Sequence, residues 1–195
     1  LCAIPPLSWK GYDSITLSGS LIETLSNASH ALSNESFLLI FPPLQFTSKN
    51  CSFILGGVNI ESDTGISGHS DGDILIHAIV DALLGALSLG DIGTLFPSNK
   101  KWENCNSVFF LKETLKKVNN NGYHIINIDT TIILQSPKIN SYISEIQKSL
   151  AMILNMNANR ISIKATTTDF LGFIGEKKGV AAFATALLKK DANEN

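Results

Sequence analysis

Charge is the scarcest property of this 195-residue sequence. Only 16% of its residues are charged, 44% are hydrophobic, and the formal net charge is −2. So small a net charge creates no field that would attract nucleic acid or an acidic membrane surface, and we expect no nucleic acid and no membrane as partners. A chain this poor in charged side chains is also expected to bury part of its surface between subunits.

Cysteine and long apolar runs are equally sparse. Cys2, Cys51 and Cys105 are scattered and form no Cys-x-x-Cys pair, which favours a reducing compartment over a disulfide framework. The best apolar run, residues 37–46, is broken by Pro42-Pro43. It falls short of the roughly 20 residues that a membrane helix needs.

Patterns of apolar residues predict alternating strands and helices in a single domain, with residues 1–50 as a divergent N-terminal segment and 51–190 as the core. Gly56-Gly57 between two short apolar runs indicates a hairpin over residues 51–60. Strands are expected over 8–12, 123–135, 160–165 and 180–188, and partial helix is the alternative for the last range. Helices are expected over 71–89, 108–118 and 137–155, and Asn106 or Ser107 is expected to cap the second of them. Residues 17–35 are expected to form a helix or an insert. This alternation predicts an α/β or α+β fold with helices on one face of a mixed sheet.

The stretch from residue 68 to residue 97 carries the densest functional signal. Asp73, His77 and Asp81 recur every four residues, so they share one stripe of an otherwise apolar predicted helix. Ser70 is expected to cap that helix, because its oxygen can accept an N–H of the first turn. Two carboxylates and an imidazole are costly to bury without a partner. A metal ion or a phosphate would supply the partner; a histidine satisfied within the core is the alternative.

Further stretches combine strand ends with polar or charged side chains. Residues 135–138 (QSPK) end a predicted strand at a predicted helix start, where N–H groups and Lys138 would suit an anion or a nucleobase edge. Residues 164–169 (KATTTD) place three hydroxyls and a carboxylate after a strand, a set that suits phosphate and Mg²⁺. Each stretch alone is also explained as a capped helix or a β-rich run, so the functional interpretation depends on their co-occurrence.

The order of the motifs in this sequence resembles that of the 2-C-methyl-D-erythritol 2,4-cyclodiphosphate synthase family. The motifs are HSDGD at 69–73, His77, GDIGTLFP at 90–97, QSPK at 135–138 and KATTTDFLGF at 164–173. The resemblance runs over residues 55–188. It implies a homotrimer of ferredoxin-like α+β subunits, with active sites between neighbouring subunits. It also implies a small nucleotide-diphosphate substrate, 4-diphosphocytidyl-2-C-methyl-D-erythritol 2-phosphate. The family cyclises this substrate and releases CMP, in the non-mevalonate route to isoprenoids.

The same resemblance implies roles for individual residues. The pair thought to stabilise the transition state corresponds to His69 and Thr167. Zinc, or another divalent metal, is expected at Asp13 and His77, and a second ion, Mg²⁺ or Mn²⁺, at Asp169, where the family usually has Glu. The expected substrate contacts are Ser70, Asp91, Ile92, Gly93, Phe96, Pro97, Ser98, Asn99, Lys100, Leu134, Gln135, Ser136, Pro137, Lys138, Ile139, Asn140, Thr166, Thr168 and Phe173.

The sequence departs from the family pattern in three places. The family's glycine-rich run with a leading Arg is degraded to residues 7–10 (LSWK). The family's Asp-x-His becomes Asp13-Ser14-Ile15, so we expect zinc to bind weakly unless His30 or Cys51 completes the site. Glu176 stands where the family has a phosphate-binding arginine, with Lys177 and Lys178 as candidate substitutes.

The alternative functions follow from these departures. One is a non-catalytic trimer that binds a cytidine nucleotide or an isoprenoid diphosphate, and a weaker one is a zinc-dependent phosphoesterase, for which no residue is placed as a base for water. The pathway and the Ser/Asn-rich N-terminus favour a plastid-type organelle (apicoplast or chloroplast) or a bacterial cytoplasm.

Overall fold

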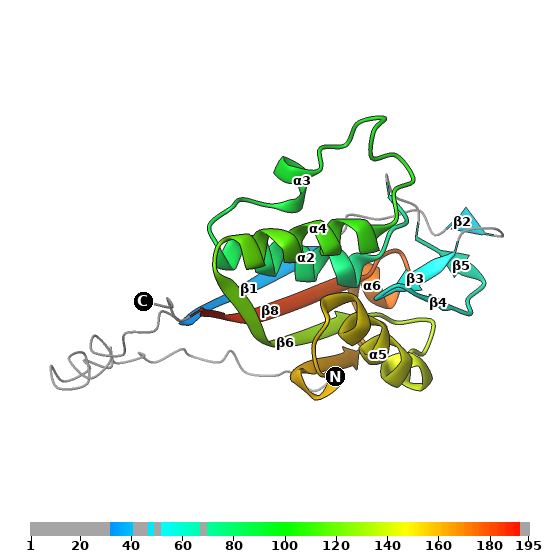
Figure 1. Ribbon diagram of the computed structural model, residues 1–195. Coiled ribbons are helices and arrows are strands. Elements are labelled where there is room, and N and C mark those ends of the chain that lie inside the picture. The colour runs from blue at the N-terminus through cyan, green and yellow to red at the C-terminus, as the bar shows by residue number, and fades with distance from the viewer. Residues whose placement is uncertain (1–31, 41–46, 49–51, 67–69, 192–195) are drawn as a thin grey trace, which may run out of the picture. The chain divides into compact units, whose positions relative to one another are not determined.

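The computed structural model describes residues 32–40, 47–48, 52–66 and 70–191. A four-stranded sheet with the order β1-β8-β6-β7 forms its centre (Figure 1). Its strands are β1 (Leu32–Ile40), β6 (Tyr123–Ile133), β7 (Ile161–Thr166) and β8 (Ala181–Lys190). β8 is antiparallel to both β1 and β6, whereas β6 and β7 are parallel. The prediction of a mixed sheet is therefore confirmed.

Helices and short ribbons complete the unit. The helices are α2 (Ile74–Ala86), α3 (Ile92–Leu95), α4 (Ser107–Asn120), α5 (Ile143–Leu154) and α6 (Gly172–Gly175), with 3-10 turns η1 (Asn140–Tyr142) and η2 (Ala158–Arg160). The ribbons pair β2 (Thr47–Ser48) with β5 (Thr64–Gly65) and β3 (Phe53–Leu55) with β4 (Val58–Ile60). Helix α5 connects the parallel strands β6 and β7, as a crossover between parallel strands requires.

One face of the sheet is buried under helices, and the other face is left open by the residues that the structure describes. Ile128 and Ile132 of β6 are fully buried, while Asn127, one position away, is exposed. On β8, Ala182 and Ala184 are buried, whereas Phe183 between them is 37% exposed. Ile133, between the buried Ile132 and Leu134, is only half-buried, because nothing among the described residues packs fully over the second face.

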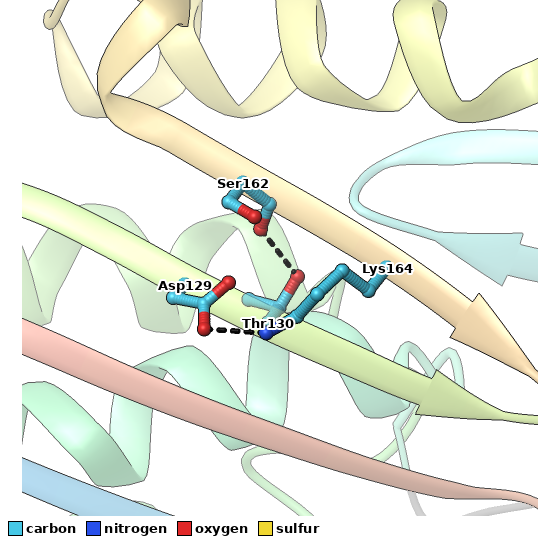
Figure 2. A network of polar contacts seen from close by, with 4 residues as sticks. All are labelled: Asp129, Thr130, Ser162 and Lys164. Atoms are coloured by element: carbon cyan, nitrogen blue, oxygen red, sulfur yellow. Dashed lines mark hydrogen bonds and ion pairs between the residues drawn. The ribbon is translucent and has the colours of Figure 1, made fainter.

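Side-chain contacts on both faces of the sheet hold the edge strand β7 to β6. Lys164 Nζ lies 2.6 Å from Asp129 Oδ2 across the two strands, and Figure 2 shows this ion pair beside the Thr130 contact. The buried Thr130 hydroxyl donates to the Ser162 carbonyl at 2.9 Å. The parallel pairing is thus supported by one ion pair and one side-chain hydrogen bond beside its backbone ladder.

Helix α2 is the centre of the hydrophobic core. It packs against the sheet on one side and α4 on the other, and Leu75, Ile79 and Leu83 are fully buried. Its N-cap is Asp73, whose side chain accepts from the Ile76 amide, so the predicted capping by Ser70 is wrong. Helix α2 therefore begins at Ile74, three residues after the predicted start at residue 71. Gly72, with a φ of +73°, forms a left-handed turn just before the helix.

The β3–β4 hairpin is confirmed, and its turn explains the two glycines. Gly56 and Gly57 have φ of +59° and +77°, a conformation that residues with a Cβ rarely adopt. Both of their amides donate to the Asp73 carboxylate, at 3.0 and 2.7 Å. Ser149 of α5 donates to the Gly56 carbonyl, so the turn is held between two helices.

Two predicted boundaries are wrong. Residues 32–35 belong to β1 and not to a helix, because pairing with β8 overrides the local preference of that segment. The predicted helix at 137 begins only at Ile143, after η1. The Leu134 amide still donates to the Thr166 carbonyl, so the chain stays extended beside β7 past the end of the strand. By contrast, the predicted cap at Asn106 is confirmed, and residues 181–190 are strand throughout.

Among the described residues, no helix is both long enough and apolar enough to cross a membrane.

Candidate active site

His77 lies in the first turns of α2, at the centre of a small polar cluster. Its Nε2 lies 3.0 Å from Ser107 Oγ of α4 and 3.2 Å from Ser70 Oγ. The Phe110 ring packs edge-on beside it. Burial lowers the pKa of His77 to about 4, against the opposing effect of the Asp71 charge. The imidazole is therefore neutral at pH 7, which is the form that binds a metal ion.

The two carboxylates on the His77 stripe have backbone partners. Burial raises the pKa of Asp73 to about 7, while amides of the hairpin turn and of Ile76 donate to it. Burial likewise raises the pKa of Asp81 to about 6, and its Oδ1 accepts from the Ile92 amide at 2.7 Å. A metal or phosphate is thus not needed to balance these two acids, and that part of the sequence interpretation is wrong.

The hydrogen bond from the Ile92 amide to Asp81 fixes the loop that contains the expected substrate contacts from Asp91 to Lys100. Asp91 caps the short helix α3 by accepting from the Thr94 amide at 2.6 Å, and Asp91 and Gly93 are exposed. The Phe96 ring packs on Trp102 and Phe110, with centroids 5.4 and 4.6 Å apart. The remaining predicted contacts in this loop, Pro97, Ser98, Asn99 and Lys100, are exposed.

A cavity of about 360 Å³ opens where β6 and β7 end. It is lined by Leu134, Gln135, Pro137, Lys138, Ile139, Asn140, Ala165, Thr166 and Thr167. The family resemblance implied a role for all of these except Ala165: Thr167 as one of the pair that stabilises the transition state, and the others as substrate contacts. The parallel pairing of β6 with β7 brings the two predicted stretches together, because the carboxyl ends of parallel strands meet at one edge of a sheet.

The turn after β7 is folded back on itself by side-chain hydrogen bonds. The Thr167 hydroxyl donates to Asp169 Oδ1 at 3.2 Å, and Thr168 donates to the Leu171 carbonyl. The Phe170 amide donates to Gln135 at 3.2 Å, which ties the turn to the cavity wall. Asp169 is exposed, as a carboxylate that meets a hydrated cation must be.

The two candidate substitutes for the phosphate arginine have different surroundings. Lys178 forms an ion pair with Glu176 at 2.6 Å. Lys177, at a φ of +61°, lines a second cavity of about 570 Å³ together with Glu61, Ser62, Asp63, Thr64, Ser136 and Pro137. Since Pro137 borders both cavities, Lys177 is the better placed of the two lysines beside the predicted nucleotide pocket.

Several predicted site residues, Asp13, His30, Cys51 and His69, lie outside the described residues, and their roles stay predictions. Within the described part of the chain, no three His, Cys, Asp or Glu side chains are grouped to hold a metal ion. The remaining predicted residues form two groups, one around the start of α2 and α3, and one at the ends of β6 and β7. Hydrogen bonds join residues within each group.

Sequence reasoning assigned no site role to Ser107 or Asp71, which the structure places next to His77. Asp81 was predicted as part of the His77 stripe, but its role in holding the Ile92 loop was not. The hydrogen bond between Asp71 and Ser107 spans 36 positions, and Ser107 carried only the signal of a helix start. Such a contact has no signature in the spacing of one sequence.

Known proteins share both the sequence and the fold. The YgbB family matches residues 44–189. A 2-C-methyl-D-erythritol 2,4-cyclodiphosphate synthase of Francisella philomiragia is 48% identical over 147 residues, which cover 75% of this chain and 92% of that protein. The enzyme of the same name from Clostridium kluyveri is 51% identical over 140 residues, 71% of this chain and 85% of its own length.

Solved structures agree with these relatives. The bifunctional IspDF of Campylobacter jejuni superposes with a TM-score of 0.78 at 39% identity, covering 83% of this chain and 43% of that one. Plasmodium falciparum IspF in complex with CDP has a TM-score of 0.70 at 36% identity, covering 84% and 97%. Asp13 precedes the matched range, whereas the motifs around His77, Pro137 and Thr167 all lie within it. On this combination of sequence, fold and site, the chain belongs to the YgbB family, with the 2-C-methyl-D-erythritol 2,4-cyclodiphosphate synthases.

Proposed function

We propose that this protein cyclises 4-diphosphocytidyl-2-C-methyl-D-erythritol 2-phosphate to 2-C-methyl-D-erythritol 2,4-cyclodiphosphate. An oxygen of the 2-phosphate attacks the β-phosphorus, a new P–O bond forms, and the P–O bond to CMP breaks, so CMP leaves with the bonding electrons. The nucleophile is already ionised, and no base is needed to activate it. Catalysis then consists of positioning and charge stabilisation.

The observation that carries this proposal is the cavity at the ends of β6 and β7. Its wall combines residues 134, 135 and 137–140, Lys138 among them, on one side with the Thr166 and Thr167 turn on the other. Amide and carbonyl groups of the first wall would suit the edge of a cytosine, and hydroxyl donors of the second would suit phosphate oxygens. A complex of the Plasmodium falciparum relative with CDP supports a cytidine nucleotide as the ligand.

The chain's own residues would hold the two reacting groups. Thr166 and Thr167 donate to phosphate oxygens, with the Thr167 hydroxyl turning from Asp169 to the substrate. Lys177, at the neighbouring cavity, supplies positive charge in place of the family's arginine. The loop of Asp91, held by Asp81, would receive the methylerythritol part.

Metal ions belong to this proposal as cofactors. The neutral, half-buried imidazole of His77 fits a zinc ligand, and the exposed Asp169 carboxylate fits Mg²⁺ or Mn²⁺. When bound, such ions would neutralise and align the two phosphate groups. Metal analysis of the purified protein tests this assignment, with His77→Ala and Asp169→Ala as the variants expected to lose zinc and Mg²⁺ respectively.

We further propose a homotrimer of ferredoxin-like subunits with active sites between them. The open sheet face with Phe183 supports burial against other copies, and a partner copy would bring the His77 group of one chain next to the cavity of another. The compartment, a plastid-type organelle or a bacterial cytoplasm, stays a prediction.

The experiment is a product analysis. Purified protein with substrate and Mg²⁺ should yield CMP and the cyclic diphosphate in equal amounts. Both products are measured by ³¹P NMR and mass spectrometry. Thr167→Val, which keeps the shape and removes the hydroxyl, should slow the reaction by at least tenfold.

Other outcomes would identify the alternatives. Release of inorganic phosphate instead of CMP would indicate a phosphoesterase. Binding of CMP without turnover of substrate would indicate a non-catalytic nucleotide-binding protein. In either case the cyclase proposal would be wrong.

A further inference from the structure

Ser107 is the buried hydroxyl that connects His77 to a carboxylate. It is the first residue of α4 and is fully buried. Its Oγ donates to Asp71 Oδ1, its backbone amide donates to Asp71 Oδ2 at 2.9 Å, and the same Oγ lies 3.0 Å from His77 Nε2. Asp71, Ser107 and His77 thus form a continuous chain of contacts across three segments.

The protons in this chain can be assigned by counting donors. An ionised carboxylate accepts hydrogen bonds but has no proton to give. The contact between Ser107 Oγ and Asp71 must therefore use the single proton of the Ser107 hydroxyl. That leaves the Ser107 oxygen only as an acceptor toward His77, so the proton between them has to be on Nε2.

We propose that Ser107, oriented by Asp71, is a positioning residue that holds His77 in the tautomer with its proton on Nε2 and its lone pair on Nδ1. This inference rests on the proposed metal-binding role of His77. A ligand histidine needs one nitrogen with a lone pair, and the hydrogen bond at the other nitrogen sets the tautomer and the ring orientation. Ser107 supplies that bond from a rigid helix start.

Ser70 does not account for the same tautomer. Its Oγ also lies near Nε2, at 3.2 Å, but within the described part of the chain it has no hydrogen bond to a carboxylate that would commit its proton, so it can donate or accept. Ser70 therefore provides a matched control: one hydroxyl at a similar distance from the same nitrogen, without the link to Asp71.

The test reads the tautomer directly in the metal-free protein. Long-range ¹H–¹⁵N correlation spectra at pH 7 should show His77 with the proton on Nε2. Ser107→Ala and Asp71→Asn should each shift His77 toward the Nδ1-protonated form. In Asp71→Asn the asparagine amide can donate to Ser107 Oγ, which leaves the Ser107 hydroxyl proton free to be donated to Nε2. Ser70→Ala should leave the tautomer as it is.

A second readout is the affinity for Zn²⁺ alone, measured by calorimetry. Loss of a hydrogen bond that orients a ligand histidine typically weakens metal affinity about 10–100-fold, and we expect this for Ser107→Ala at an unchanged far-UV spectrum. If Ser107→Ala does not fold, Asp71→Asn provides the same tautomer test.

A wild-type His77 protonated on Nδ1, or a tautomer that neither variant shifts, would overturn the inference. Neither result depends on turnover, so failure of this inference is distinguishable from failure of the proposed cyclase activity. The converse also holds: an inactive protein with the Nε2-protonated tautomer would contradict only the proposed function.

Discussion

Buried polar side chains in this protein are satisfied mostly by backbone amides and by hydroxyls from distant segments. Asp73 binds the hairpin turn, Asp81 binds the α3 loop, and Asp71 binds the start of α4. Each carboxylate therefore joins α2, or the segment before it, to a different neighbouring element. The charged stripe that resembles a ligand set in the sequence is, apart from His77, a set of anchors for the loops around the site.

Asp81 should make stability depend on pH. Its folded-state pKa of about 6 lies above the ordinary value of 3.8, so the folded protein binds more protons between these values, and the free energy of unfolding falls as pH rises through this window. Asp81→Asn keeps an oxygen for the Ile92 amide and removes the charge. Above pH 6 this variant should be more stable than wild type by about 1–2 kcal/mol, because it avoids the cost of burying the Asp81 charge. The gain is limited to this size because solvent at the exposed loop beside Asp81 screens part of that cost.

Urea unfolding of both proteins from pH 3.5 to pH 7.5 measures this difference. The two curves should converge below pH 4, where Asp81 is protonated in both states. A difference that is constant with pH would contradict the argument.

Removing the Thr114 hydroxyl should stabilise the folded protein. Within the described residues its Oγ1 is buried and has no hydrogen-bond partner. Thr114→Val keeps the shape, and we expect a gain of about 1 kcal/mol in the free energy of unfolding, because an unpaired buried hydroxyl is costly. Thr130→Val is the matched control: its hydroxyl donates to the Ser162 carbonyl, so this change should destabilise by about 1 kcal/mol. Equal effects of the two substitutions would show that Thr114 has a partner after all.

At the scale of elements, the glycine turn of the β3–β4 hairpin couples backbone conformation to packing. A Cβ on Gly56 would lie 2.6 Å from Ile146 Cγ2, whereas a Cβ on Gly122, with a similar positive φ, would meet nothing within 4 Å. Gly122→Ala should therefore cost about 1 kcal/mol for the backbone alone. Gly56→Ala should cost about 2–4 kcal/mol, because overpacking adds to the same backbone term. Thermal unfolding of the two variants decides this, and equal losses would mean that Ile146 moves aside freely.

Element boundaries show where local sequence signals succeed. The caps and turns that consist of one or two residues, such as Asn106 and Gly56-Gly57, were predicted correctly because their chemistry is local. The start of α2 was placed too early because Ser70, Asp71 and Asp73 all have capping side chains. Only the contacts of Ser70 and Asp71 with residues of other segments leave Asp73 as the cap.

At the scale of the whole molecule, the open sheet face is where we expect other copies to bind. Phe183→Glu would place a charge in the proposed trimer interface, where it has no partner. Light scattering should give about three times the chain mass of 21.0 kDa for the wild type, and a lower mass for this variant. Met152→Glu, on the outer side of α5 at an 81% exposed position, should leave the mass unchanged. A wild-type monomer would contradict the trimer, and a trimeric Phe183→Glu would place the interface elsewhere.

The sequence by itself determined the family and the types of the longer elements from β3 onward, namely β3, β4, α2, α4, β6, α5, β7 and β8. It also predicted the two stretches that line the cavity at the ends of β6 and β7, because long motifs, helical spacing and glycine turns are local properties of the chain. Tertiary structure decided what the sequence left open. It paired residues 32–40 with β8 and brought Thr166 beside Lys138. It also gave the carboxylates of α2 backbone partners and connected His77 to Asp71 through Ser107. These are contacts between positions up to about 150 residues apart, and such contacts are set by packing in three dimensions and not by periodicity along the chain.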